Sequence, residues 1–399
     1  MPGSIFHPFR ALNLALLAGL TLVGLTLAGC QQAPGSSQQP SQNRLQANPV
    51  VGDLAAAAGF VYNFSSEKNA ISVIQAGTAK VLTTLTLPEG HPSSILASHN
   101  GKYLLVLSQD AGKLYVYAPG QNHLLLLTVA VGIGPDRVQL SEDDKKVWIS
   151  LTGEDAIAEL DFAQGFDKAP RLRKLPTGRN NPRDEHRMLA MGLASVAVPN
   201  SADNSVSLIY PDTGKTLTIE AGNKPAVVAI ASWDGQDRMV IIGNQASNTV
   251  TLYDLDTHTS KTFSKVGETP TDIALDPWQQ MAYITMAGSN DVAAIDYQQQ
   301  RMIRRIPVGN RPTHIYNVSN TLQIQCGGMY QHAEIWVGND GGDSVSLIDG
   351  NLILFKTTLP VGKGPHKIAF WSANAYVSNL SDGTVSVIDR SQIKSDPRL

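Results

Sequence analysis

The segment from Val361 to Asp389 reads VGKGPHKIAFWSANAYVSNLSDGTVSVID and contains every feature that decides the fold. Its first five residues include a Gly and a Pro three positions apart, and three short runs of alternating apolar and polar residues follow, separated by polar turns. Alternation with β-branched and aromatic residues predicts strands. Pro fixes φ and cannot donate to a strand ladder, so the Gly-x-x-Pro pattern predicts a crossing between strands.

This pattern recurs along the chain at intervals of roughly 43 residues, and such a period indicates a repeat architecture. The turns are marked by Pro49, Pro92, Pro135, Pro182, Pro225, Pro270, Pro312 and Pro365. Seven of these are preceded by a Gly, namely Gly90, Gly132, Gly178, Gly222, Gly267, Gly309 and Gly362. A tight hairpin residue precedes the third strand at Asn69, Asn204, Asn248, Asn290 and Asp343. Four antiparallel strands per repeat predict an all-β protein, a β-propeller of four-stranded blades.

The repeat count predicts eight blades. The first three strands of the unit occur eight times, whereas the fourth is clear only seven times. The segment 43–48 can supply the missing outer strand and close the ring from the N-terminal side. Seven blades with surplus terminal strands is the alternative, because the first unit lacks a Gly before Pro49. The inner strand of the fourth unit, near residues 183–193, has a weak strand pattern.

The repeats resemble a known family in the segments Tyr376–Asn379 and Val385–Asp389, and again in Phe60–Asn63 and Ile71–Ile74. They are similar to the YVTN repeat of bacterial and archaeal surface and periplasmic propellers, over about residues 49–389. The resemblance implies a propeller, seven-bladed in most members and related in fold to the haem d1 domain of periplasmic nitrite reductases. It implies no particular activity. The second and third units depart from the pattern, because they lack the Asn-ended motif.

The first thirty residues of the chain predict where in the cell the protein is located. An apolar run from Ala11 to Ala28 has the character of a secretory signal peptide. The ending Leu27-Ala28-Gly29-Cys30 resembles the lipobox of bacterial lipoproteins, which implies that Cys30 is diacylated and becomes the mature N-terminus. An uncleaved membrane anchor is the alternative. Gln31 resembles the residue that follows Cys in lipoproteins sorted to the outer membrane. We therefore expect a signal peptide at 1–29, a linker at 30–43, the propeller at 44–389 and a tail at 390–399.

Composition and motifs exclude several classes of function. The formal net charge is -3 and aromatic residues make up 6% of the chain, which argues against nucleic acid as a partner. Acylation of Cys30 leaves Cys326 without an intramolecular disulfide partner. The chain lacks a Walker loop, a dinucleotide fingerprint, a Gly-x-Ser-x-Gly elbow and a His-Glu-x-x-His motif. A non-enzymatic role is favoured, and an enzymatic one stays open.

Ionisable residues follow several of the repeat prolines, where inner strands begin at one mouth of the predicted channel. Candidate ligand-binding residues there are Asp136, Arg137, Arg183, Asp184, Asp272, His314, His366 and Lys367. Successive strand residues face opposite ways, so about half of them point inward. Such a set suits a small anion, a metal or a cofactor. The alternative is a solvated rim whose charges satisfy one another.

A second candidate site lies in the longest repeat interval. Cys326, Met329 and His332 are the donor types that a soft metal such as copper prefers, and His314 is a candidate fourth donor. The alternative is a loop that packs its thiol and Met against the blade. Covalent c-type haem is not indicated, because the Cys-x-x-Cys-His motif is absent.

Together these observations predict a non-enzymatic propeller, anchored through lipid in the bacterial cell envelope, that binds a protein or an envelope component. We expect it at the outer membrane, facing the periplasm or the cell surface. A redox protein holding haem d1, a quinone or copper through His314, His366 or the Cys326 loop is the main alternative. A lactone hydrolase with a metal held by Asp136, Asp184 and Asp272 is a third.

Overall fold

The computed structural model describes residues 43–46, 53–65, 68–179, 189–323 and 329–393. The chain divides into a unit of residues 1–39 and a unit of residues 40–399, and all the described residues belong to the second. Cys30, Arg183, Asp184 and Cys326 therefore lie outside the described residues. No described helix is long and apolar enough to span a bilayer.

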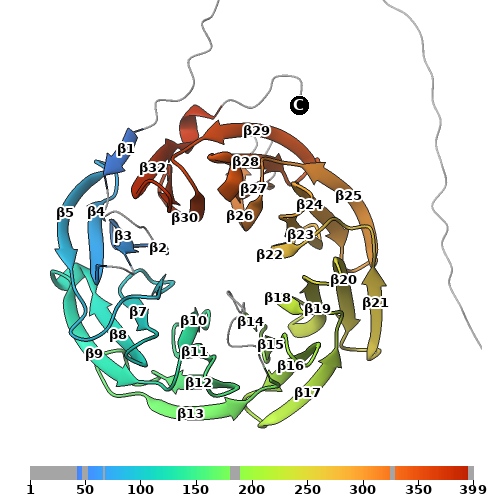
Figure 1. Ribbon diagram of the computed structural model, residues 1–399, viewed down its shortest axis with the longest axis horizontal. Coiled ribbons are helices and arrows are strands. Elements are labelled where there is room, and N and C mark those ends of the chain that lie inside the picture. The colour runs from blue at the N-terminus through green and yellow to red at the C-terminus, as the bar shows by residue number, and fades with distance from the viewer. Residues whose placement is uncertain (1–42, 47–52, 66–67, 180–188, 324–328, 394–399) are drawn as a thin grey trace, which may run out of the picture. The chain divides into compact units, whose positions relative to one another are not determined.

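The described strands form eight separate four-stranded antiparallel sheets, arranged as the blades of a ring (Figure 1). The inner strands are β2 (Leu54–Ala57), β6 (Ser94–Ala97), β10 (Pro135–Leu140), β14 (Ala190–Met191), β18 (Pro225–Trp233), β22 (Pro270–Asp276), β26 (Pro312–Gln323) and β30 (Pro365–Trp371). The second strands are β3 (Phe60–Ser65), β7 (Leu104–Ser108), β11 (Lys146–Leu151), β15 (Val196–Asn200), β19 (Gln236–Asn244), β23 (Met281–Met286), β27 (Met329–Asn339) and β31 (Asn374–Asn379).

The remaining strands complete each blade on its outer side. The third strands are β4 (Ala70–Gln75), β8 (Lys113–Ala118), β12 (Ala156–Asp161), β16 (Ser205–Tyr210), β20 (Thr249–Asp254), β24 (Asp291–Asp296), β28 (Ser344–Asp349) and β32 (Thr384–Asp389). The outer strands are β5 (Lys80–Leu85), β9 (Leu124–Ala130), β13 (Arg171–Pro176), β17 (Lys215–Glu220), β21 (Thr259–Phe263), β25 (Arg301–Pro307), β29 (Leu354–Pro360) and β1 (Asn43–Gln46). Short 3₁₀ turns occur at Pro119–Gln121, Asp340–Gly342 and Arg390–Gln392.

Strand β1 closes the ring. It pairs antiparallel with β32, with Asn43 opposite Val387 and Gln46 opposite Thr384, so the last blade takes its outer strand from the N-terminal side of the propeller. This confirms the eight-bladed arrangement with a closing strand near residues 43–48. The inner strand with a weak pattern, β14, is only two residues long.

The apolar core is divided among the junctions between blades. The described residues form eight buried clusters, and each cluster joins two neighbouring blades around the ring. The cluster between the last and first blades, for example, packs Val61 and Ile74 against Tyr376 and Val385. Because the two faces of each central strand pack against different neighbours, these strands are buried on both faces and stabilise the ring as a whole.

A repeated clamp fixes the start of each of four inner strands. In the seventh blade, buried Asn339 donates through Nδ2 to the hydroxyls of Ser344 (3.1 Å) and Ser346 (2.9 Å), and the N–H of Gly309 donates to the Ser346 hydroxyl (3.2 Å). A Cβ on Gly309 would overlap the Asn339 amide, so only Gly fits there. We call this arrangement the Asn clamp. Equivalent clamps pair Asn200 with Gly178 and Asn379 with Gly362. In the fifth blade Asn244 donates to the hydroxyls of Thr249 and Thr251 in the same way, but the N–H of Gly222 donates to Asn244 Oδ1 rather than to a hydroxyl.

A second interaction ties each of five crossings to the preceding blade. Asn290, in the hairpin between β23 and β24, has φ +56° and accepts through Oδ1 from the N–H of Arg311 (2.7 Å). Asn and Asp tolerate this left-handed conformation better than other non-Gly residues. The predicted hairpin residues Asn69, Asn204, Asn248 and Asp343 accept in the same way from the N–H groups of Leu87, Lys224, Thr269 and Gly364.

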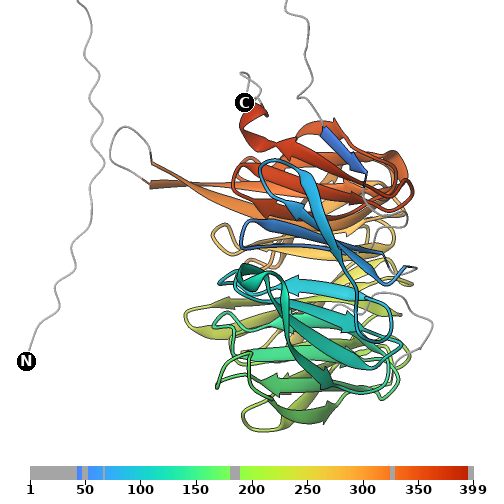
Figure 2. The same ribbon diagram turned by 90° about the vertical axis from the view of Figure 1, so that its left-hand side faces the viewer.

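The seventh blade carries the longest hairpin of the described residues. Strands β26 and β27 have 12 and 11 residues, and they extend outward past the neighbouring strands (Figure 2). Met329 pairs with Gln323 and His332 pairs with Asn320. The candidate metal-binding residues Met329 and His332 are therefore strand residues near the tip of this hairpin.

Candidate functional site

The two faces of the ring differ in the connections that they carry. Inner strands begin on the face with the Gly-x-x-Pro crossings, which we call the crossing face. They end on the opposite face, where hairpins join first to second and third to fourth strands, and which we call the hairpin face. The ionisable candidates follow the repeat prolines, so they lie toward the crossing face.

Irregular pairing after the proline sets the direction of these side chains. The register of the inner strand against the second strand shifts between Pro135 and Val138, between Pro225 and Val227, and between Pro270 and Asp272. The same shift occurs in β26 and β30. Such a bulge interrupts the alternation of a strand and re-aims the side chains beside it.

Two histidines and an aspartate from three successive blades form a chain of contacts. His314 Nδ1 lies 3.3 Å from Asp272 Oδ2, and His314 Nε2 lies 3.1 Å from His366 Nδ1. The rings of His314 and His366 meet edge to face, with centroids 4.4 Å apart. The carboxylate of Asp272 also accepts from the N–H groups of Ile273 (2.8 Å) and Ile315 (3.2 Å). Both nitrogens of His314 are therefore engaged.

The chain continues to the first and third blades through Asp53. His366 Nε2 lies 4.0 Å from Asp53 Oδ1, and Arg137 Nη1 lies 3.4 Å from Asp53 Oδ2. Arg137 belongs to the third blade and Asp53 to the first, so the two side chains meet past the second blade, at the centre of the ring. The side chains of Asp53 and Asp272 are 9% and 6% exposed. With Lys367, whose charge acts on both carboxylates, these residues form what we call the central cluster.

Cationic side chains lie close to the two buried carboxylates. Arg137 Nη1 lies 3.4 Å from Asp53 Oδ2, and the charges of Arg137 and Lys367 act on both Asp53 and Asp272. These two positive charges match the two carboxylates in number when both carboxylates are ionised.

The two carboxylates differ in proton affinity although both are buried. Burial raises the pKa of Asp272, and the charges of Lys367 and Arg137 only partly offset it. Burial also acts to raise the pKa of Asp53, but Lys367, Arg137 and His366 outweigh it, so the pKa of Asp53 lies below its usual value. Burial likewise raises the pKa of Tyr316, whose hydroxyl accepts from the N–H of Ile368 (3.2 Å).

As it is placed, His314 does not act as an axial ligand of haem iron or as a copper ligand. A metal needs a nitrogen lone pair directed at it, whereas both nitrogens of His314 face protein partners. No three His, Cys, Asp or Glu side chains are placed to hold a metal ion in the part of the chain that the structure describes. The hairpin register places His332 opposite Asn320, six strand positions from His314, or about 20 Å. The strand register therefore does not place the backbone of His332 next to that of His314.

The structure brings together five of the predicted channel-mouth residues, namely Arg137, Asp272, His314, His366 and Lys367. Asp136 is half-buried beside Arg137 on β10. Arg183 and Asp184 cannot be placed, because they lie outside the described residues. Sequence reasoning missed Asp53 and also Ser94, whose hydroxyl donates to Asp53 (3.3 Å). Ser94 follows its repeat proline by two positions, as Arg137 and Asp272 do, so an alignment of the repeats on their prolines identifies it.

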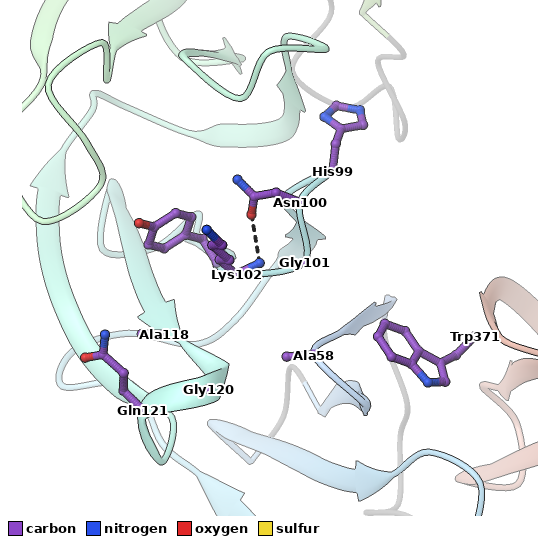
Figure 3. Close-up of a pocket in the computed structure, with 10 residues that line it drawn as sticks. Ala58, His99, Asn100, Gly101, Lys102, Ala118, Gly120, Gln121 and Trp371 are labelled. Carbon is purple, nitrogen blue, oxygen red and sulfur yellow. Dashed lines mark hydrogen bonds between the residues drawn. The ribbon is translucent and has the colours of Figure 1, made fainter.

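The hairpin face has two hollows away from the central cluster. One, of about 550 Å³, lies between the first, second and eighth blades, where His99 and Gln121 stand opposite Trp371 (Figure 3). His99 is held by Asp144 of the third blade through a 2.9 Å contact. The other, of about 610 Å³, is lined by residues of the third to sixth blades. Unlike the central cluster, these hollows are open for a ligand.

The opposite pKa shifts of Asp272 and Asp53 predict opposite dependences of stability on pH. A carboxyl whose pKa is raised by folding contributes a stability that falls as the pH rises from 3.8 through the raised value. We therefore expect the unfolding free energy of the wild type, relative to Asp272→Asn, to fall over this range. A tenfold difference in the proton affinity of the carboxyl between the folded and the unfolded chain changes the unfolding free energy by about 1.4 kcal/mol. Urea denaturation of the full chain at several pH values measures it.

Asp53→Asn is the matched variant. The lowered pKa of Asp53 means that its contribution is fully present above 3.8 and is lost as the pH falls below that value. The difference in unfolding free energy between the wild type and Asp53→Asn should therefore shrink as the pH is lowered. If the unfolding free energies of the two variants, each relative to the wild type, change with pH in the same direction, the two carboxylates do not have opposite pKa shifts.

No protein-family model and no curated protein matches the sequence. Three similar solved structures are Sqt1 of Saccharomyces cerevisiae, BamB of Moraxella catarrhalis, and NirN, a dihydro-haem d1 dehydrogenase solved in complex with DHE. Sqt1 is 11% identical with a TM-score of 0.68, covering 87% of this chain and 97% of Sqt1. BamB is 14% identical with a TM-score of 0.60, covering 88% of this chain and 99% of BamB. NirN is 16% identical with a TM-score of 0.59, covering 79% of this chain and 67% of NirN. Such distant likenesses establish the fold alone: the chain is a β-propeller.

Proposed function

We propose that this protein is a lipid-anchored propeller of the bacterial cell envelope, of the YVTN-repeat kind, and that it serves as a non-enzymatic scaffold for a protein partner. The observation that carries the proposal is the contrast between the two parts of the ring. The ionisable side chains of the central cluster contact one another, whereas the hairpin face offers two hollows of about 550 and 610 Å³. A rigid ring with an open face suits binding.

The anchor rests on the sequence ending Leu27-Ala28-Gly29-Cys30 and on the polar linker that follows it. Multiple acyl chains on one Cys give stable membrane binding, whereas one chain does not. The outer membrane is the proposed location, because Gln31 rather than Asp follows the Cys.

A channel-bound cofactor is the second candidate function, and the pair of imidazoles in the central cluster is the observation that favours it. It requires the contact between His314 and His366 to open, because the nitrogens face each other at 3.1 Å. A visible absorption band or a bound metal in the purified full chain, lost on substitution of His366 by Ala, would favour this candidate over the scaffold.

The anchor predicts that Cys30→Ser prevents acylation of the protein. The wild-type chain should pellet with the membrane fraction and yield an acylated Cys30 peptide by mass spectrometry, because the thioether-linked lipid holds it there. The variant should retain its leader or appear in the soluble fraction. An unmodified Cys30 in membrane-bound wild-type protein would overturn the proposed anchor.

The scaffold predicts that partners contact the hairpin face. A photoreactive benzoylphenylalanine at Gln121 or at Leu193, each lining one hollow, should give a discrete adduct in irradiated cells. The same group at Lys363, an exposed residue on the crossing face, is the matched control and should give none. No adduct at either hairpin-face position, with the full chain folded and membrane-bound, would contradict the scaffold.

A further inference from the structure

The larger hollow on the hairpin face has the features of a built recognition site. It has a volume of about 610 Å³ and takes its lining from the turns and strand ends of four successive blades. Trp148, Trp233 and Tyr297 supply aromatic surface, and the rings of Trp233 and Tyr297 stack with centroids 5.9 Å apart. We call this hollow the aromatic groove. Its size and lining are typical of pockets that take a bulky apolar side chain.

One wall of the aromatic groove is held in a single conformation by a carboxylate. Asp237 accepts from the N–H groups of Leu193 (2.6 Å) and Ala194 (3.1 Å), and from the hydroxyls of Ser195 (2.6 Å) and Ser232 (2.7 Å). This network joins the fourth blade to the fifth. A turn fixed by three hydrogen bonds loses little further freedom when a ligand binds, so the groove is preorganised.

Exposed apolar side chains stand at the edge of the aromatic groove. Leu193 lines it and is 56% exposed, and Trp278, which is 72% exposed, follows the lining residue Pro277. An exposed Trp beside an aromatic pocket is characteristic of interaction surfaces, where Trp is among the commonest sources of binding energy.

A buried donor in the lining lacks an acceptor. Trp148 is 2% exposed, and its indole N–H has no hydrogen-bond partner among the described residues. A buried N–H without a partner costs free energy, which a ligand carbonyl group or a bound water recovers. An extended peptide segment carries such carbonyl groups at regular intervals. A peptide whose carbonyl group reached this N–H would recover that free energy.

The charge of the rim selects the kind of peptide. Three acidic residues line the groove, Glu142, Asp143 and Asp212, against one basic residue, Lys146. Lys146 is already paired with Asp212 at 3.1 Å, and Asp143 is paired with the adjacent Lys145 at 3.0 Å, so Glu142 is the acidic lining residue that has no ion-pair partner among the described residues. The rim therefore attracts a cationic segment and repels an anionic one.

We propose that the aromatic groove binds an extended segment of a partner protein that carries a bulky apolar side chain flanked by Lys or Arg. The proposal deepens the proposed function and rests on it, because it names the surface and the chemistry of the partner. The apolar side chain fills the space between Trp148, Trp233 and Leu193, and a flanking cation lies against Glu142.

Binding of two defined peptides to the full chain tests the proposal. The probes are a dye-labelled Lys-Leu-Phe-Arg-Lys peptide and its counterpart with Glu at the three basic positions, followed by fluorescence anisotropy. The basic peptide should bind on the order of tenfold more tightly, because of the acidic rim. Leu193→Ser and Glu142→Lys should each weaken it several-fold. The matched controls are Leu124→Ser, on the outer strand β9, and Glu220→Lys, at the end of β17, both exposed and remote from the groove; they should leave binding unchanged.

Equal affinity for the two peptides, or binding that Leu193→Ser and Glu142→Lys leave intact, would overturn the proposal. Self-association of the full chain that is lost in Leu193→Ser would assign the groove to a second copy and would also overturn it. If the basic peptide does not bind but adducts still form from Gln121, the proposal for the aromatic groove is refuted and the proposed scaffold function is not. Absence of adducts from both hollows would refute the scaffold itself.

Discussion

The Asn clamp, which occurs in four of the eight blades, is the interaction that positions the inner strands of those blades. The Asn at the end of a second strand holds two hydroxyls of the third strand, and the Gly of the same blade packs directly on its amide. The ties from hairpin residues such as Asn290 then join each crossing to the preceding blade. Both interactions act on the residues just before the repeat proline. They therefore fix where an inner strand begins and which of its side chains reach the centre of the ring.

The crossing face and the hairpin face of the ring depend on the placement of the inner strands in different ways. On the crossing side, inner strands that start at one level bring Asp53, Asp272 and the two histidines together, and their charges compensate one another at the ring axis. On the hairpin side, turns of unequal length leave hollows between blades. The pairing of β1 with β32 closes the ring of blades, so the hairpin face with its hollows belongs to a rigid structure. This division of roles supports a binding function.

Much of this was predictable from sequence, and the failures have physical causes. The blade count was predictable from the prolines, glycines and Asn-ended strands, because each of them has the same local structural role in every repeat where it occurs. The inward-facing set was not predictable, because the bulge after each proline breaks the alternation from which facing is inferred. Asp53 was missed because its repeat lacks the Gly and its strand begins five residues after Pro49. The aromatic groove has no motif, since its lining comes from turns of four blades.

The unfolding free energy of Gly309→Ala tests the Asn clamp most directly. Gly309 does not adopt a positive φ, so the added methyl group acts only by overlapping the Asn339 amide. Gly120→Ala is the matched control, because a Cβ there meets no atom within 4 Å and the residue also lacks a positive φ. The clamp predicts a loss of about 1 to 3 kcal/mol for Gly309→Ala and little change for Gly120→Ala in urea denaturation. Equal stability of the two variants would contradict it.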